Sequence, residues 1–172
     1  MDTKKSSSFR LHLRPIKPSD QDFLLRVYAS TREQDRALAG WSEPEWLQFL
    51  QQQFDFQHEQ YTRNYANRTF DLVLVDDQPA GRLYVNRQGS EIRVVDIALL
   101  PNFRRQGIGG GLLRRLLQES DGSGNYLGLH VERNNPILDF YQQLGFSTVA
   151  DRGVYLYMVR QPSPGGVTGA AT

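Results

Sequence analysis

The segment from residue 92 to residue 131 constrains the fold more than any other part of the chain. Residues 92–100 are apolar and end at Pro101, and residues 126–131 form a second apolar run, so both predict strands. Between them a glycine-rich turn at 106–111 opens a segment with leucines at positions 112, 113, 116 and 117, which predicts a helix with one apolar side. Because such crossovers join parallel strands, we expect 92–100 and 126–131 to lie side by side and parallel.

The residues upstream of this unit predict one strand, two helices and then two more strands. Residues 9–14 alternate apolar and polar and predict the first strand. A helix capped by Ser19 or Asp20 and a second one capped by Ser42 are expected to follow. The strands expected next, which form an antiparallel meander with 92–100, lie at 70–75 and 80–86.

The residues downstream predict a short helix at 136–144 and final strand material near Val149 and at 154–159. The whole order predicts an α/β (α+β) fold: a mixed, mostly antiparallel central sheet of six to seven strands flanked by about four helices. We expect one domain over residues 9–160. The ends, 1–8 and 161–172, are expected to be flexible because they are polar or rich in glycine and proline.

Composition narrows the chemistry. The chain has no cysteine, which excludes disulfides and a thiol nucleophile, and its three histidines (His12, His58 and His130) lack metal-ligand spacing, so we expect no metal. With 20 basic and 19 acidic side chains, the net charge of +1 does not point to nucleic acid or to an anionic membrane. No apolar run approaches the roughly 20 residues that span a bilayer. Without a signal-peptide-like stretch, we expect a soluble, cytoplasmic protein.

The turn at 104–111 has the composition of an anion-binding site. Gly107 and Gly109 let the backbone approach a ligand closely, and the helix that follows offers unpaired N–H groups at its positive end. Arg104 and Arg105 add positive charge, so a phosphate or pyrophosphate is the natural guest. The alternative is a tight turn whose glycines only permit packing. A nucleotide-binding loop is disfavoured, because the lysine of a Walker A loop is absent and Leu112 stands where a dinucleotide fingerprint needs glycine.

Two segments resemble the GCN5-related N-acetyltransferases, the GNAT superfamily. Residues 97–109, with Arg104-x-x-Gly107-x-Gly109, are similar to the acetyl-CoA signature of that family. Residues 132–146 are similar to a later family segment, in which an asparagine precedes a short helix, an aromatic–tyrosine pair and a closing Leu-Gly-Phe. The motifs cover 92–146, and the order of elements fits from about residue 9 to residue 160.

The resemblance implies acetyl-CoA as cosubstrate and assigns residues to its binding. Backbone groups of Ile97, Ala98 and Leu99 would pair with the pantetheine arm, because the family's sheet splays after this strand. Asn134, or Asn135 if the spacing is read one residue later, would bind the same arm. The pyrophosphate would be held by the turn, at Arg104, Arg105, Gln106, Gly107, Ile108, Gly109 and Gly110.

The resemblance also implies catalytic residues. Tyr141 matches the family tyrosine that protonates the departing CoA thiolate, whereas an isolated tyrosine between Phe140 and Phe146 would be read as a core residue. Asp96 is the best candidate for the general base, because it interrupts the apolar run of residues 94–100, where a carboxylate is costly unless it is paired or used. The alternative for Asp96 is an ion pair with Arg82 or Arg93.

Two positions depart from the family pattern. Where well-known members carry a base glutamate, this chain has Arg93 on one strand and Leu129 on the other, while His130 and Glu132 are lesser candidates for the base. The resemblance places the first two helices over the acceptor site, and most aromatic residues from Trp41 to Tyr65 are expected to pack against the sheet.

The leading hypothesis is therefore an N-acetyltransferase that passes acetyl from acetyl-CoA directly to the primary amine of a small molecule or peptide, with homodimer formation open. The alternative is a non-catalytic acyl-CoA-binding sensor or interaction domain, which would keep the glycine turn but would not need Tyr141 as an acid.

Overall fold

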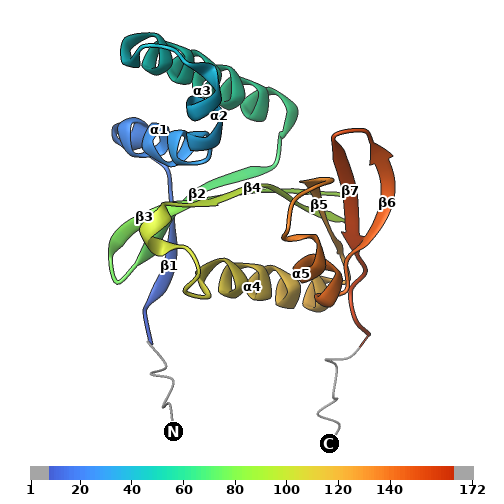
Figure 1. Ribbon diagram of the computed structural model, residues 1–172. Coiled ribbons are helices and arrows are strands. Elements are labelled where there is room, and N and C mark those ends of the chain that lie inside the picture. The colour runs from blue at the N-terminus through green and yellow to red at the C-terminus, as the bar shows by residue number, and fades with distance from the viewer. Residues whose placement is uncertain (1–7, 165–172) are drawn as a thin grey trace, which may run out of the picture.

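In the computed structural model, which describes residues 8–164, a seven-stranded sheet separates two layers of helices (Figure 1). The strand order is β1-β2-β3-β4-β5-β7-β6. Every neighbouring pair is antiparallel except β4 and β5, which are parallel, so the parallel crossover predicted between residues 92 and 131 is confirmed. The strands are β1 Leu11–Pro15, β2 Arg68–Val75, β3 Gln78–Gln88, β4 Glu91–Leu99, β5 Tyr126–Glu132, β6 Ser147–Arg152 and β7 Tyr155–Arg160.

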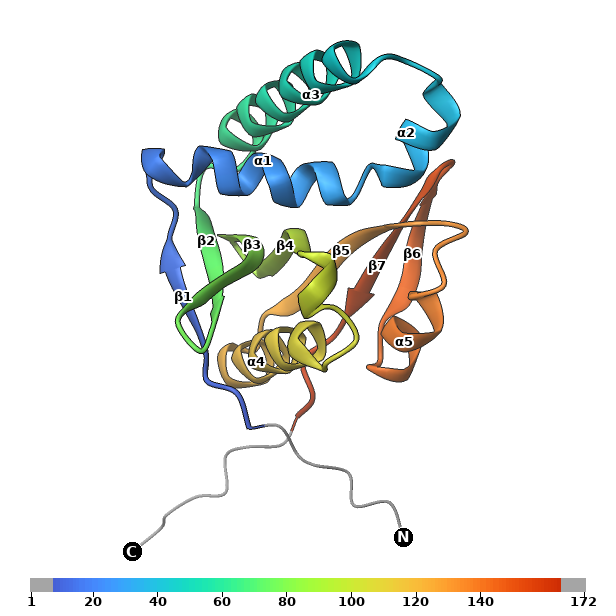
Figure 2. The same ribbon diagram turned by 60° about the vertical axis from the view of Figure 1, so that its left-hand side comes forward.

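In this part of the chain five α-helices accompany the sheet: α1 Gln21–Ser30, α2 Glu33–Ala39, α3 Glu43–Asn64, α4 Ile108–Ser123 and α5 Leu138–Gln143. Figure 2 shows α1 and α3 stacked over one face of the sheet and α4 across the other. The predicted α/β fold is confirmed, and α2 is the one helix that sequence reasoning missed. It has no buried residue, so it carries no apolar stripe that a periodicity could reveal.

Each face of the sheet has its own hydrophobic core. Alternate residues of β3 and β4, such as Leu83, Val85 and Val94, pack with the leucines of α4 and with Tyr141 and Phe146. On the opposite face Leu72 and Leu74 of β2 pack with Leu24 of α1 and with a stripe along α3. That stripe is Trp46, Leu50 and Phe54, which are spaced by four residues and therefore share one side of the helix.

The ends of the chain are only partly described. The predicted flexible segment 1–8 lies almost wholly outside the described residues, as does most of the predicted tail 161–172. Residues 161–164 form no helix or strand, although the Ser163 N–H donates to Asp121 Oδ1 at 2.7 Å. Within the described part of the chain, none of the helices combines the length and the apolar character needed to cross a membrane.

Candidate active site

The sheet splays between β4 and β5. Their parallel pairing runs only from Glu91↔Tyr126 to Val94↔Leu129, while β4 continues to Leu99. A bulge lies at the same point, because Tyr84 of β3 faces Asp96 whereas Val85 faces Val94. Val95 is thus the extra residue. Beyond it, no strand of the described chain pairs with the edge of β4 that would face β5.

The free backbone groups of that edge belong to alternate residues. The Leu100 N–H donates to the Ala80 carbonyl oxygen of β3 at 2.8 Å. Because hydrogen-bonded pairs alternate along an antiparallel ladder, Ala98 also directs its N–H and C=O toward β3, and Ile97 and Leu99 direct theirs toward the open edge. Of the three residues predicted to pair with a pantetheine arm, Ile97 and Leu99 have the orientation for it.

A cleft of about 620 Å³ runs along this open edge. One wall is the end of β4, and the other is the start of α4 together with α5. The C-terminal end of α1 and the start of α2 close its upper side. Its lining residues are Ser30, Thr31, Glu33, Gln34, Ile97, Ala98, Leu99, Arg104, Gly109, Gly110, Leu113, Ile137, Phe140 and Tyr141.

The glycine turn is shaped to receive an anion at the end of the cleft. Arg105 and Gly107 both adopt left-handed backbone conformations, with φ of 60° and 81°. The first helical bond of α4 runs from the Gly111 N–H to the Gly107 carbonyl oxygen at 2.9 Å, so the N–H groups of residues 108–110 have no helical acceptor. A Cβ added to Gly107 or Gly109 would meet no atom within 4 Å, which leaves room for a ligand against the backbone. These donors fit a pyrophosphate.

The side chain of Arg104 holds the turn in place. Its Nε donates to the Leu99 carbonyl oxygen at 2.8 Å, and its Nη2 donates to the Ser30 hydroxyl at 3.0 Å. Arg104 therefore joins the end of β4 to the end of α1. The Leu99 carbonyl oxygen already accepts a hydrogen bond from Arg104. Gln106 is used similarly, since its Nε2 donates to the Asn102 carbonyl oxygen at 2.6 Å. The side chains of both residues are thus engaged within the protein, and the Arg104 N–H also donates to the Pro101 carbonyl oxygen, at 3.2 Å.

Neither Asn134 nor Asn135 lines the cleft; both lie exposed in the loop between β5 and α5. The Asn135 side chain accepts a hydrogen bond from the Ile137 N–H at 3.0 Å, which forms a local turn just before α5. The Asn134 side chain makes no such bond to the described residues, so of the two it is the one available for a pantetheine amide.

Tyr141 lies in the wall of the cleft. It is 6% exposed, and its ring packs edge-on against Phe146 with ring centroids 5.7 Å apart. Burial raises the pKa of the Tyr141 phenol, so the group stays protonated at neutral pH. Its hydroxyl has no hydrogen-bond partner within residues 8–164 but opens onto the cleft, and its proton is therefore free for a ligand.

Asp96 sits beside the bulge, on the face of the sheet covered by α3. Its Oδ2 accepts hydrogen bonds from Arg82 Nη2 and from the Tyr61 hydroxyl, each at 2.9 Å, and its Oδ1 accepts only a long one from Arg82 Nε, at 3.4 Å. Arg82 is 3% exposed and also donates to Gln57 of α3 at 2.9 Å. Of the two ion-pair partners that the sequence suggested for Asp96, Arg82 and Arg93, the structure shows Arg82.

The neighbours of this ion pair are aromatic. Burial and the charge of Asp96 raise the pKa of Tyr61, which therefore remains a hydrogen-bond donor. Tyr84 lies next to Arg82 on β3 and is fully buried, and within the described residues its hydroxyl lacks a hydrogen-bond partner.

A second polar cluster lies where β4, β5 and β7 still pair. Arg93 Nε donates to Glu91 Oε1 at 2.6 Å, and the Tyr157 hydroxyl donates to the same oxygen at 2.6 Å. The Arg93 guanidinium lies 4.5 Å from the centroid of the Tyr157 ring, on which His130 also stacks at 4.9 Å. We call Glu91, Arg93, His130 and Tyr157 the Tyr157 cluster. Sequence reasoning considered Arg93 and His130 one at a time, and only the strand order brings the four residues together.

The splayed sheet, the cleft along β4 and the amide-rich turn together define an acyl-CoA-dependent transferase fold. A model of the acetyltransferase (GNAT) family matches residues 35–146, and the chain belongs to that family. Acetyl-CoA is the cosubstrate of the family. A search among curated proteins found no match to the chain.

Solved structures agree on the fold. The PaiA N-acetyltransferase of Thermoplasma acidophilum, solved in complex with coenzyme A, superposes with a TM-score of 0.65 at 18% identity and covers 88% of this chain and 99% of its own. The ribosomal-protein-S18-alanine N-acetyltransferase of Escherichia coli gives 0.62 at 18% identity, with 92% and 98% covered. An acetyltransferase from Thermus thermophilus gives 0.63 at 25% identity, with 88% and 96% covered.

Proposed function

We propose that the protein transfers acetyl from acetyl-CoA directly to the primary amine of a small molecule or peptide. The observation that supports this most strongly is the position of Tyr141, whose protonated hydroxyl opens onto the cleft opposite the free edge of β4. The arm of a cosubstrate whose pyrophosphate lies on the turn would follow β4 to the splay, where Tyr141 lines the cleft and Asp96 follows the bulge.

The residues divide the chemistry between them. The deprotonated amine attacks the thioester carbonyl carbon, a C–N bond forms, and the C–S bond breaks as its electron pair leaves on sulfur. Tyr141 donates its phenolic proton to that thiolate and later regains a proton from solvent. The proton lost by the amine goes to Asp96, and Oδ1 is the oxygen with spare acceptor capacity, because Oδ2 already accepts two short hydrogen bonds.

The test combines binding with turnover. Calorimetry with acetyl-CoA measures the Kd, and thiol release in the presence of a panel of amines measures transfer. For Tyr141→Phe we expect kcat to fall by about 10²–10⁴-fold with the Kd for acetyl-CoA unchanged, because only the acidic proton is removed. Tyr126→Phe, on β5 and outside the cleft lining, is the matched control and should behave as the native protein.

Two outcomes would contradict the proposal. If acetyl-CoA binds but no amine releases thiol, the protein is a non-catalytic acyl-CoA-binding module. If acetyl-CoA does not bind, the assignment of the turn at 104–111 to the pyrophosphate is wrong.

A further inference from the structure

The acceptor has to reach the splay from the face of the sheet that α3 covers. On the other face, the space next to β4 and β5 is filled by the core that includes Val94, Leu129 and the leucines of α4. The α3 face carries polar side chains instead: Asp96 and the Tyr157 cluster. Figure 1 shows that α3 lies above β2 to β4, while the β6–β7 hairpin rises beside β5.

The bulge at Val95 brings a cation and an anion onto this one face. Arg93 and Asp96 are three residues apart and would point to opposite faces of a regular strand. The extra residue shifts the alternation of side chains between the two faces by one, so Arg93 and Asp96 lie on the same face. Arg93 contacts His130 and Tyr157 there, and Asp96 contacts Tyr61 of α3. An acceptor at the splay therefore lies between a carboxylate and a guanidinium.

Positive charge predominates around Tyr157. The guanidinium of Arg152, on β6, lies 6.0 Å from the same ring centroid, and the described residues give it no acidic partner. Among residues 8–164, Glu91 is the only carboxylate that bonds to Arg93 or Tyr157. Burial, followed by the charges of Arg93 and Arg152, lowers the pKa of His130, so this ring adds no charge at neutral pH. Two arginines thus face one glutamate.

The donors of Arg93 are only partly used. Its Nε is committed to Glu91, and its Nη1 lies 3.2 Å from His130 Nδ1, which fixes the plane of the guanidinium against Tyr157. Its Nη2 makes no hydrogen bond within residues 8–164. A guanidinium held in plane with the N–H groups of Nη2 unused is suited to donate a charge-assisted hydrogen bond to a carboxylate.

We infer that the acceptor is an amino acid, a primary amine that carries a free carboxylate, with its amine at Asp96 and its carboxylate on Arg93 and Arg152. This inference rests on the proposed function and narrows the class of acceptor. It also gives Arg93 a role. At this position the family resemblance predicted a base glutamate, which would repel the carboxylate of such an acceptor, whereas an arginine attracts it.

The experiment compares matched acceptors. Glycine, β-alanine and larger amino acids are each assayed beside their own carboxamide, which keeps the size and the amine but removes the negative charge. We expect kcat/KM to be at least about tenfold higher for the acids, since a charge-assisted hydrogen bond from a guanidinium to a carboxylate is strong. Arg93→Gln and Arg152→Gln should each reduce this acid-to-amide ratio, mainly through the KM of the acid, and leave the Kd for acetyl-CoA unchanged.

Arg152 is exposed on β6, so Arg152→Gln keeps the test valid even if Arg93→Gln disturbs folding. Arg63→Gln, which changes an exposed arginine of α3 paired with Glu59, is the matched control and should keep the native ratio. Equal rates for acids and carboxamides, or a ratio that neither substitution alters, would overturn the inference while the acetyltransferase proposal stands. If neither amino acids nor carboxamides are acetylated while another amine of the panel is, the inference fails and the acetyltransferase proposal stands; if no amine of the panel releases thiol, the proposed function itself has failed.

Discussion

The ion pair between Asp96 and Arg82 contributes to stability, and Asp96 is also the proposed general base. Their carboxylate and guanidinium are almost fully removed from water, with side-chain exposures of 14% and 3%. Taking both charges out of water is costly, and their mutual attraction offsets that cost only while both are present. From α3, Tyr61 adds a hydrogen bond to the carboxylate and Gln57 accepts one from the guanidinium.

Replacing one partner should therefore leave an uncompensated buried charge. We expect Asp96→Asn to lower the free energy of unfolding by about 3–5 kcal/mol, and a double variant with Arg82→Met to recover part of that loss. Urea unfolding of the two variants and the native protein measures both effects. A loss below about 1 kcal/mol for Asp96→Asn would show that the pair is well solvated, contrary to its burial.

At the scale of the element, α3 is a long helix held by few apolar contacts. Only Trp46, Leu50 and Phe54 are buried along Glu43–Asn64, and most of its other side chains are glutamines and charged residues. Its further turns bring Gln57 and Tyr61 to the sheet. The position of this helix therefore decides whether Asp96 keeps its hydrogen bond from Tyr61.

The start of α3 is held by a cap that a single substitution can test. Glu45 Oε2 accepts from the Ser42 N–H at 2.9 Å and from the Ser42 hydroxyl at 2.6 Å, an arrangement typical of a helix N-terminus. Ser42→Ala removes the hydroxyl, and we expect a loss of about 1 kcal/mol in the free energy of unfolding. Ser42→Thr keeps the hydroxyl and should stay close to the native value. Equal urea midpoints for all three proteins would contradict a capping role.

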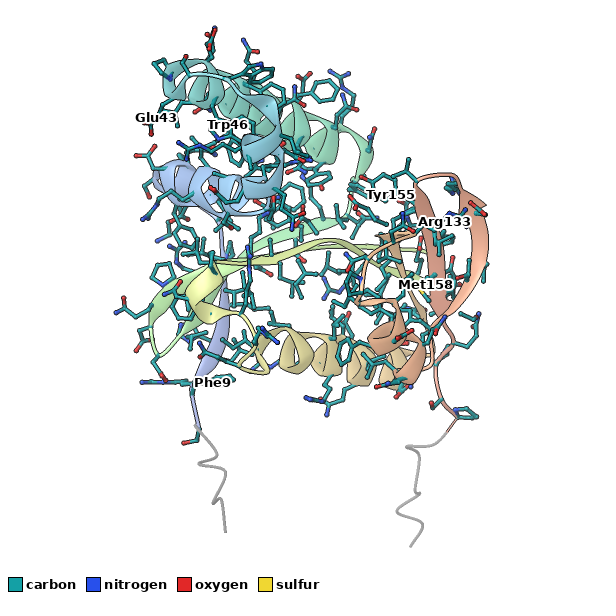
Figure 3. The ribbon with its side chains drawn as sticks, viewed as in Figure 1. Phe9, Glu43, Trp46, Arg133, Tyr155 and Met158 are labelled. Carbon is teal, nitrogen blue, oxygen red and sulfur yellow. The ribbon has the colours of Figure 1, made fainter. Side chains whose placement is uncertain are left out.

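At the scale of the whole molecule, ion pairs tie helices of both layers to the sheet. Arg14 of β1 donates two hydrogen bonds of 2.8 Å to Asp20, at the start of α1. Arg87 of β3 and Arg160 of β7 pair with Glu119 and Asp121 of α4. Figure 3 shows side chains filling the space between each helical layer and the central sheet. Because each pair includes a titratable carboxylate, the free energy of unfolding should depend on pH.

Low pH should weaken these ion pairs by protonating their carboxylates. The hydrogen bonds from their arginine partners lower the pKa values of Asp20, Glu119 and Asp121 in the folded protein. A lowered folded-state pKa contributes stability that is complete above the unfolded-state pKa, about 4 for these groups, and is lost as the pH falls through the folded-state pKa. We expect the contribution of these three carboxylates to the urea midpoint to be flat from about pH 7 to pH 5 and to fall below about pH 4. Asp20→Asn should flatten that fall, and an identical profile would argue against the Asp20 contribution.

The sequence by itself determined the central unit of this protein and the family to which it belongs. The period-two and helical patterns around residues 92–131 depend on local backbone geometry, so they predicted a parallel β4–β5 pair and the helix between them correctly. The same local reasoning found the cap at Ser42 and the glycine turn. It could not find α2, because a helix without buried residues has no apolar period.

The tertiary structure decided which side chains meet. Whether Asp96 pairs with Arg82 or Arg93 depends on a one-residue bulge at Val95, and a bulge changes the face of every residue after it without marking the sequence. Likewise, Glu91 and Tyr157 are 66 residues apart in the sequence. They share a hydrogen bond because the strand order places β7 only two positions from β4, with β5 between them. Long-range pairing of this kind is set by packing of the whole sheet, which no local pattern records.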